Sequence, residues 1–158
     1  MIARCVLLVL LLVSSSASAE TIAGKVVRVA DGDTITILVE REQVRVRLAN
    51  IDTPERKQPW GKKAKQALAD LVAGAWVEVV VVDIDRYGRT VGLVLVNGIE
   101  ANRALVRSGD AWVYPRYNRD PALPKIEAEA RAAGRGLWSL PAAERVPPWQ
   151  WRRDRRRR

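Results

Sequence analysis

The stretch from Ile22 to Leu48, IAGKVVRVADGDTITILVEREQVRVRL, decides the fold because it contains three runs typical of β-strands. Residues 22–30, 34–40 and 43–48 are rich in β-branched side chains, and the polar turns Asp-Gly and Glu-Arg-Glu separate them. In the third run, valine and leucine alternate with arginine, so Arg47 lies on the face opposite the core. The stretch therefore predicts a three-stranded meander that projects Arg47 away from its apolar side.

The rest of the chain adds strands and helices to this meander. Apolar residues recur at i, i+3, i+4 and i+7 within residues 62–72, which predicts an amphipathic helix that ends near Gly74. Two further strands are expected at 76–82 and 90–96, and two further helices at 100–107 and 123–133. Five strands with a helix after the third, and about three helices in all, indicate an α+β fold built on a five-stranded OB-type barrel. Such a barrel commonly binds oligonucleotides, although fold alone does not establish function.

Residues 1–19 are typical of a secretory signal peptide. Arg4 supplies a positive charge, residues 6–13 are uniformly apolar, and small residues at 17–19 favour cleavage near Ala19 and Glu20. The apolar run is too short to span a bilayer, so an uncleaved membrane anchor is the weaker alternative and no stable membrane insertion is expected. We therefore expect an exported protein, periplasmic or secreted. The single cysteine, Cys5, lies in this segment, which leaves the mature chain without disulfides.

The remaining residues fit one domain with a single core, followed by a basic C-terminal end. We place the domain at 20–144 and a Pro/Trp segment with an Arg-rich tail at 145–158. Of the net charge of +9, residues 152–158 hold +5, so the basicity belongs mostly to the tail. We expect residues 147–151 to be extended against the domain, and the tail to be disordered but attractive to polyanions.

Three charged motifs contain the residue types needed to cleave a phosphodiester bond. They are Asp31 to Thr34 (DGDT), Arg47 to Glu55 (RLANIDTPE) and Asp85 to Arg89 (DRYGR). Carboxylates can hold a hard metal ion, another carboxylate can deprotonate water, and arginine binds phosphate through two parallel hydrogen bonds. The chain has no histidine, which excludes a histidine base, nucleophile or metal ligand.

Each motif also has a purely structural alternative. Asp31-Gly32-Asp33 suits a hairpin turn, and Thr53-Pro54 suits the capped start of a helix. Residues 85–89 could form a solvated loop whose ion pairs contribute little. The three motifs together favour a functional site over three independent structural coincidences.

The motifs, in this order, resemble those of the staphylococcal nuclease (thermonuclease) family. ANRALVRSG at 101–109 and GLWS at 136–139 extend the resemblance, which runs from about Ile22 to Ser139. It implies a Ca²⁺-dependent endonuclease that acts on DNA and RNA and leaves 3′-phosphate and 5′-hydroxyl ends. Because a substrate cleft on one small domain requires no dimer, we expect a monomer. The resemblance also implies a preference for single-stranded or locally opened substrates. The alternative is a non-catalytic OB-fold module that binds nucleic acid or other polyanions.

The resemblance also implies a metal site. Asp33 and Asp52 would be direct carboxylate ligands, and the backbone carbonyl of Thr53 would complete the protein's contribution. Asp31 would lie one shell further out and orient a ligand or a bound water molecule.

Catalytic and substrate-binding roles follow from the same resemblance. Glu55 would be the general base, and Arg47 and Arg89 would bind the scissile phosphate. Tyr87 would contact a neighbouring phosphate, and Tyr117 a nucleotide base. The chain departs from the family pattern in its short loop after Glu55, and in a proline, Pro115, where the pattern leads us to expect a tyrosine.

Overall fold

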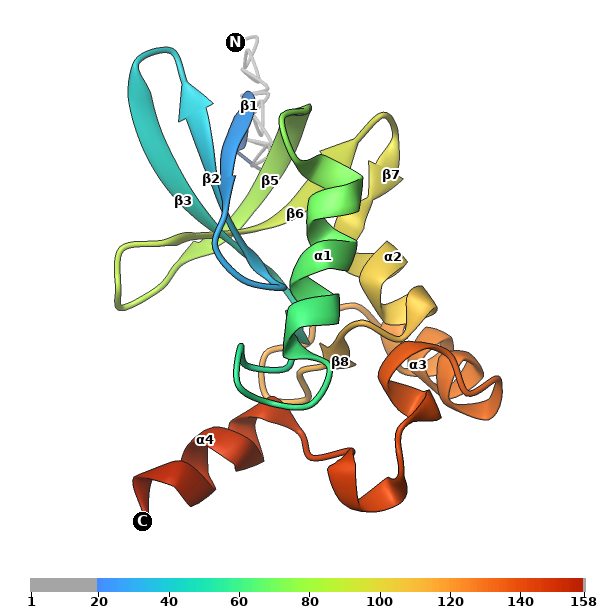
Figure 1. Cartoon of the computed structure of the whole chain (residues 1–158). Coiled ribbons are helices and arrows are strands. Elements are labelled where there is room, and N and C mark those ends of the chain that lie inside the picture. The colour runs from blue at the N-terminus through green and yellow to red at the C-terminus, as the bar shows by residue number, and fades with distance from the viewer. Residues whose placement is uncertain (1–19, 158) are drawn as a thin grey trace, which may run out of the picture.

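The computed structural model describes residues 20–157, so the expected signal peptide lies outside the described residues. Its centre is a strongly bent sheet that closes on itself, with helices packed at one side and below (Figure 1). The barrel strands are β1 (Thr21–Val29), β2 (Thr34–Val39), β3 (Glu42–Leu48), β5 (Trp76–Ile84) and β6 (Thr90–Val96). Two short strands, β4 (Ile51–Asp52) and β8 (Trp112–Val113), pair separately, and β7 (Ile99–Glu100) extends β6.

The barrel closes because β3 pairs on both of its edges. It is antiparallel to β2 and parallel to β6, where Val46 lies opposite Thr90 and Leu48 lies opposite Gly92. Each of the five expected strands is present within two residues of its expected bounds. The prediction of a five-stranded OB-type barrel is confirmed.

The three expected helices are also present, as α1 (Gly61–Val72), α2 (Ala101–Ser108) and α3 (Leu123–Ala132). Short 3₁₀ turns follow at η1 (Gly136–Ser139) and η2 (Ala142–Glu144). Thr53 does not cap a helix, because α1 begins eight residues later at Gly61. The segment around Asp52 is therefore free of the structural role that a helix start would give it.

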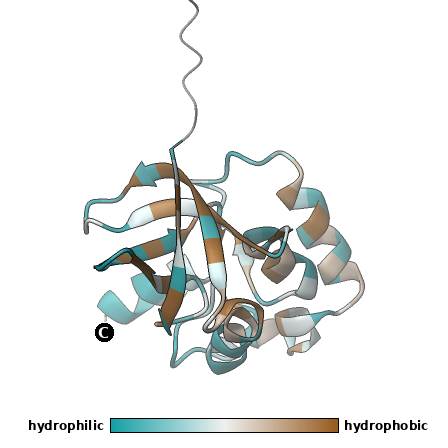
Figure 2. Ribbon diagram, turned by 90° about the horizontal axis from the view of Figure 1, so that it is seen from above, coloured by the Kyte–Doolittle hydropathy of each residue, from teal (hydrophilic) through white to brown (hydrophobic). Residues whose placement is uncertain are grey.

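The expectation for the C-terminal end was wrong. Residues 147–151 are not simply extended and the arginine tail is not disordered, because Pro148–Arg156 form a fourth helix, α4. Pro148 occupies the first turn, where its fixed φ and missing N–H suit a helix start. The run of arginines carries the helix out to Arg156, and Figure 2 shows this end of the molecule as predominantly hydrophilic.

Two apolar clusters hold the fold together. The larger fills the barrel and the space under α1 and α2, with Ile35, Val46, Leu68 and Leu105 among its fully buried members. Burial alternates along β6, where every second residue from Thr90 to Val96 is buried, as expected for a strand with one face toward the core. Figure 2 shows apolar segments on the barrel strands and on the helices that pack against them. The smaller cluster contains Trp112, Ala130, Leu137 and Trp138, with Trp60, Leu140 and Trp149 packed against it. Trp149 thereby attaches the start of α4 to the body of the protein.

Asn102 is a fully buried polar residue that joins α2 to the barrel. Its amide nitrogen donates to the carbonyls of Ala49 at 2.9 Å and Gly92 at 3.2 Å, and its carbonyl accepts from the Val94 N–H at 3.0 Å. Ala49 follows β3 directly, so this contact also fixes the chain that leads to Asp52. Within residues 20–157, no helix combines the length and apolar character needed to cross a bilayer.

Replacing Asn102 with alanine should destabilise the protein by at least about 2 kcal/mol, because buried backbone groups would lose their partners. Urea unfolding of the mature chain measures this change. Gln66→Ala, on the exposed face of α1, is the control and should stay within about 0.5 kcal/mol of the parent. Equal stability of the two variants would contradict a structural role for Asn102.

Candidate active site

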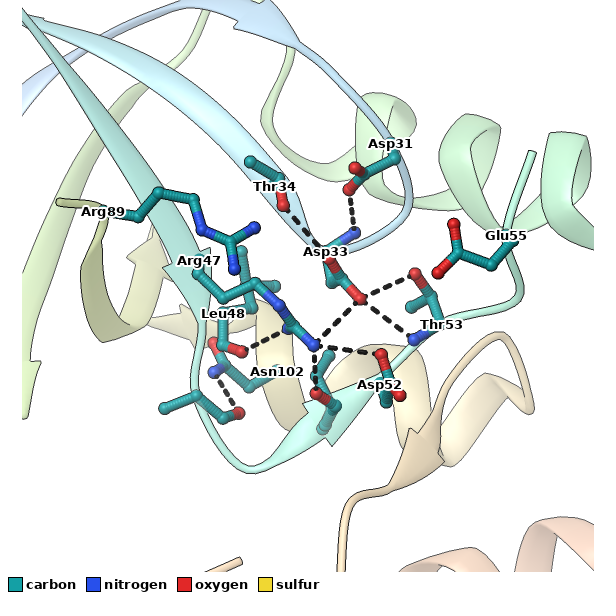
Figure 3. A network of polar contacts seen from close by, with 12 residues as sticks. Asp31, Asp33, Thr34, Arg47, Leu48, Asp52, Thr53, Glu55, Arg89 and Asn102 are labelled. Carbon is teal, nitrogen blue, oxygen red and sulfur yellow. Dashed lines mark hydrogen bonds and ion pairs between the residues drawn. The ribbon is translucent and has the colours of Figure 1, made fainter. Parts of the chain in front are cut away.

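The first two motifs, DGDT and RLANIDTPE, meet at one end of the barrel. The turn between β1 and β2 contributes Asp33, the end of β3 contributes Arg47, and β4 contributes Asp52 (Figure 3). Arg47 Nη2 lies 3.3 Å from Asp33 Oδ2 and 3.1 Å from Asp52 Oδ1. Both carboxylates are buried, so the guanidinium that they share reduces the repulsion between their two negative charges.

The turn that carries Asp33 is built to approach Thr53 closely. The Asp33 N–H donates to Asp31 Oδ1 at 3.1 Å, so the expected turn geometry and the expected site coexist. A Cβ at Gly32 would lie 2.7 Å from Thr53 Oγ1, so only glycine fits here. Thr53 N–H and Oγ1 both donate to Asp33 Oδ2, at 3.0 and 2.9 Å. Hydrogen bonds between Asp33 and Thr53 thus join the DGDT motif to the RLANIDTPE motif.

Arg47 also organises the backbone around the site. Its Nη1 donates to the Leu48 carbonyl at 2.8 Å and its Nη2 to the Ile51 carbonyl at 3.0 Å. These contacts hold the corner between β3 and β4, from which Asp52 projects. Arg47 therefore faces the carboxylates rather than solvent, and its role is structural as well as electrostatic.

Burial and neighbouring charges shift the pKa values of Asp31, Asp33 and Asp52 in different directions. Burial would raise the pKa of Asp33, but the charge of Arg47 and the hydrogen bonds from Thr53 outweigh it and hold the pKa below its usual value. Burial raises the pKa of Asp52 although Arg152 and Arg47 oppose the shift. Burial, followed by the charge of Asp33, raises the pKa of Asp31 to about 6. Asp33 therefore stays ionised to a lower pH than its neighbours.

The third motif lies on the hairpin loop between β5 and β6. Asp85 accepts the backbone N–H groups of Tyr87 and Arg89 through Oδ1, and its Oδ2 lies 2.7 Å from both Nε and Nη2 of Arg89. Figure 3 shows the Arg89 guanidinium reaching from this loop toward Arg47. The loop is thus ordered around one carboxylate that orients Arg89.

The two expected substrate tyrosines lie at the surface. Tyr87 is 66% exposed and its hydroxyl accepts from Arg86 Nη2 at 2.7 Å. Tyr117 is 56% exposed and packs edge-on against Tyr114, with ring centroids 4.8 Å apart. Both rings are accessible, but among the described residues no hydrogen bond or ion pair joins either tyrosine to the carboxylate cluster.

Arg152 is a site residue that the sequence did not reveal. From α4, its Nη2 lies 2.6 Å from Asp52 Oδ2, and its Nη1 lies 3.2 Å from Asp52 Oδ1 and 2.7 Å from Glu55 Oε1. The only sequence signal was a proline followed by Trp149 and Arg152 at helical spacing, and the surrounding arginines concealed it. Asp52, the expected metal ligand, and Glu55, the expected base, thus both bind the guanidinium of Arg152.

The donor set suits a hard cation in part. Asp33 Oδ2 and Asp52 Oδ1 converge on Arg47 Nη2, and Ca²⁺ takes oxygen ligands of this type in a loose geometry that water or substrate can complete. Within residues 20–157, no three Asp, Glu, His or Cys side chains are grouped closely enough to hold a metal alone. Two carboxylates that need water and phosphate oxygens to complete the coordination of a cation agree with both observations.

Comparisons with known proteins agree with this geometry. A family model described as "Staphylococcal nuclease homologue" matches residues 45–140. An "Uncharacterized endonuclease" of Escherichia coli O157:H7 is 49% identical over 146 residues, covering 92% of this chain and 94% of that protein. A "Micrococcal nuclease" of Shigella flexneri is 44% identical over 156 residues, covering 92% and 88%. The chain belongs to the staphylococcal nuclease family.

Membership of the staphylococcal nuclease family supports nuclease activity for this chain. "Protein ParB" of Escherichia coli is another relative, 48% identical over 158 residues, covering 93% of this chain and 88% of that protein. The match to each of these relatives covers most of both chains, so the similarity extends beyond the barrel strands.

Asp85→Asn should lower the rate of nucleic-acid hydrolysis by about tenfold, because Arg89 would lose its orienting partner. The free energy of unfolding should change by less than about 1 kcal/mol, since this ion pair is partly exposed and asparagine keeps an oxygen that can accept the two backbone N–H groups. Steady-state kinetics and urea unfolding measure the two effects. Asp83→Asn, which removes an exposed carboxylate of the same hairpin, is the control. A wild-type rate for Asp85→Asn would contradict the orienting role.

Proposed function

We propose that the mature chain is an exported, Ca²⁺-dependent endonuclease that hydrolyses DNA and RNA and leaves 3′-phosphate and 5′-hydroxyl ends. The observation that carries the proposal is the convergence of Asp33, Asp52 and Arg47 at one end of an OB-type barrel, with Glu55 on the adjoining loop. The signal-like segment supports export. Family membership supports the nuclease activity itself.

In this proposal Asp33 and Asp52 hold the cation, together with the Thr53 carbonyl. When bound, the ion supplies positive charge that offsets the charge developing on the phosphate. The lowered pKa of Asp33 keeps one ligand ionised, which favours cation binding. Asp31 contributes indirectly, because its carboxylate holds the turn that aims Asp33.

Glu55 is the proposed general base that takes a proton from the attacking water. Its side chain is 39% exposed, more than either buried aspartate, so water can reach it. It follows Asp52 by three residues, which places the base beside the proposed ligand. The protein needs no histidine for this step, since a carboxylate can serve as the base.

Arg47 and Arg89 are the proposed phosphate-binding groups. Arg89 reaches toward the site from a loop whose geometry Asp85 fixes, so its guanidinium is positioned before substrate arrives. Arg47 already bridges the carboxylates and would add charge next to the phosphate. Exposed Tyr87 and Tyr117 are proposed to contact a neighbouring phosphate and a base, which favours single-stranded or locally opened substrate. All of these groups come from one chain, which is consistent with a monomer.

Glu55→Gln and Arg89→Ala should each reduce Ca²⁺-dependent cleavage of single-stranded DNA at least about a hundredfold, the scale for a lost base or transition-state charge. The assay uses residues 20–158 with Ca²⁺ or with a chelator, and tests product ends for removable 3′-phosphate. Glu78→Gln, on the exposed face of β5, is the matched control and should cleave like wild type.

Two outcomes would contradict the proposal. Undiminished cleavage in chelator would exclude the metal-dependent mechanism. Chelator-insensitive binding without any cleavage would identify a non-catalytic OB-fold module, the alternative function.

A further inference from the structure

We propose that Arg152 is a positioning residue, and that the C-terminal segment from Val146 to Arg152 is a clamp that holds Glu55 beside Asp52. The inference rests on the proposed function, because it assigns Arg152 to the orientation of the proposed base. It goes beyond the family motifs, since α4 follows the last of them. The clamp acts on Glu55 at two points, its side chain and its backbone.

The first point of the clamp is the guanidinium of Arg152. Nη1 lies between Glu55 Oε1, at 2.7 Å, and Asp52 Oδ1, at 3.2 Å, while Nη2 lies 2.6 Å from Asp52 Oδ2. The planar fork therefore ties both carboxylates to one rigid group, which a flexible ammonium could not do. This arrangement fixes the direction of a glutamate that is otherwise substantially exposed.

The second point is Gln58, in the short loop after the proposed base. Its carbonyl accepts the Glu55 N–H at 3.1 Å, and its amide nitrogen donates to the Val146 carbonyl. Gln58 is only 5% exposed, so this link lies inside the protein. The backbone of Glu55 is thus held through one buried side chain by the segment that leads into α4.

Aromatic packing anchors the clamp to the domain. Trp149 stacks on Tyr114 with ring centroids 5.2 Å apart and planes within 3° of parallel, and it lies edge-on to buried Trp112 at 6.0 Å. Trp149 and Arg152 are three residues apart, so they lie on adjacent positions of one helix face. Withdrawing Arg152 by moving α4 would separate these rings, which favours a fixed element over a displaceable one.

The clamp is compatible with a cation at the neighbouring aspartates. Arg152 contacts both oxygens of Asp52 and only Oε1 of Glu55, and an ionised carboxylate accepts at about four positions, so each carboxylate keeps further acceptor positions. The ionised carboxylates of Asp31, Asp33, Asp52 and Glu55, taken together with the guanidinium groups of Arg47 and Arg152, carry a net charge of −2. One divalent cation would neutralise this charge. Arg152 thus completes the charge balance rather than replacing the metal.

The test compares Arg152→Ala, Arg152→Lys and wild type at saturating Ca²⁺, on a short single-stranded oligonucleotide, in the mature full-length chain. We expect Arg152→Ala to lower kcat by about tenfold to a hundredfold, the loss typical of a misplaced catalytic group, with KM changed less than about threefold. Arg152→Lys should restore activity only in part, because it keeps the charge but loses the fork. Arg41→Ala, in the turn at the other end of β3, is the matched control.

A double-mutant cycle separates positioning from a merely structural role. If Arg152 acts through Glu55, adding Arg152→Ala to Glu55→Gln should cause no further loss beyond about twofold. A full additional loss would show that Arg152 acts independently of Glu55, through Asp52 or through the fold, and would overturn the inference. Melting temperatures of all variants identify any that fail to fold, and Arg152→Lys is the variant relied on if Arg152→Ala does so.

The same experiment distinguishes failure of the inference from failure of the proposed function. Wild-type kcat in Arg152→Ala would overturn the inference, and a kcat above wild type would overturn it and also identify Arg152 as a competitor for the site. If Glu55→Gln is as active as wild type, the proposed base itself is wrong. If Glu55→Gln is impaired while both Arg152 variants cleave normally, only the clamp is wrong.

Discussion

The contact on which the site depends is the bridge from Arg47 to the two buried aspartates. Two carboxylates packed side by side away from water repel each other and lose hydration, so neither can remain ionised without a compensating charge. Arg47 supplies this charge to both aspartates, and its contacts with the Leu48 and Ile51 carbonyls keep it in place. Arg152 adds a second positive charge at Asp52. Removing one partner of such a buried pair costs on the order of 3–5 kcal/mol. Reduced activity of an Arg47 variant would therefore combine lost structure with lost catalysis, and Glu55 and Arg89 are cleaner probes.

The pairing of the barrel strands places Arg47 beside the two aspartates. Because β3 pairs with both β2 and β6, its last residues are held at the barrel end, where Arg47 meets the turn carrying Asp33. The Leu48 N–H also donates to the Asp33 carbonyl at 2.8 Å, which joins turn and strand by backbone. Asn102 holds the chain beyond β3 to the barrel and α2. Helices on one side thus stabilise the strand ends from which the polar side chains project.

The barrel and most of the site could be predicted because their signals are local. Alternation in residues 43–48 identified both a strand and the outward direction of Arg47, and Asp31-Gly32-Asp33 proved to be a turn that also delivers a carboxylate. The C-terminal helix was missed because its composition is dominated by arginine, which suggested a solvated tail. Its stability depends on Trp149 meeting Tyr114, and its role depends on Arg152 meeting residues about a hundred positions earlier. Periodicity within a segment carries no information about such distant partners.

The central claim is that Asp33 and Asp52 form one cation site in a nuclease of this family. Calorimetric titration of the mature chain with Ca²⁺, without nucleic acid, tests it most directly. The account predicts one bound ion per chain, and an affinity at least about tenfold weaker in both Asp33→Asn and Asp52→Asn, because each loses a charged oxygen ligand. Unchanged Ca²⁺ affinity in both variants would contradict it and would separate the buried aspartates from metal binding.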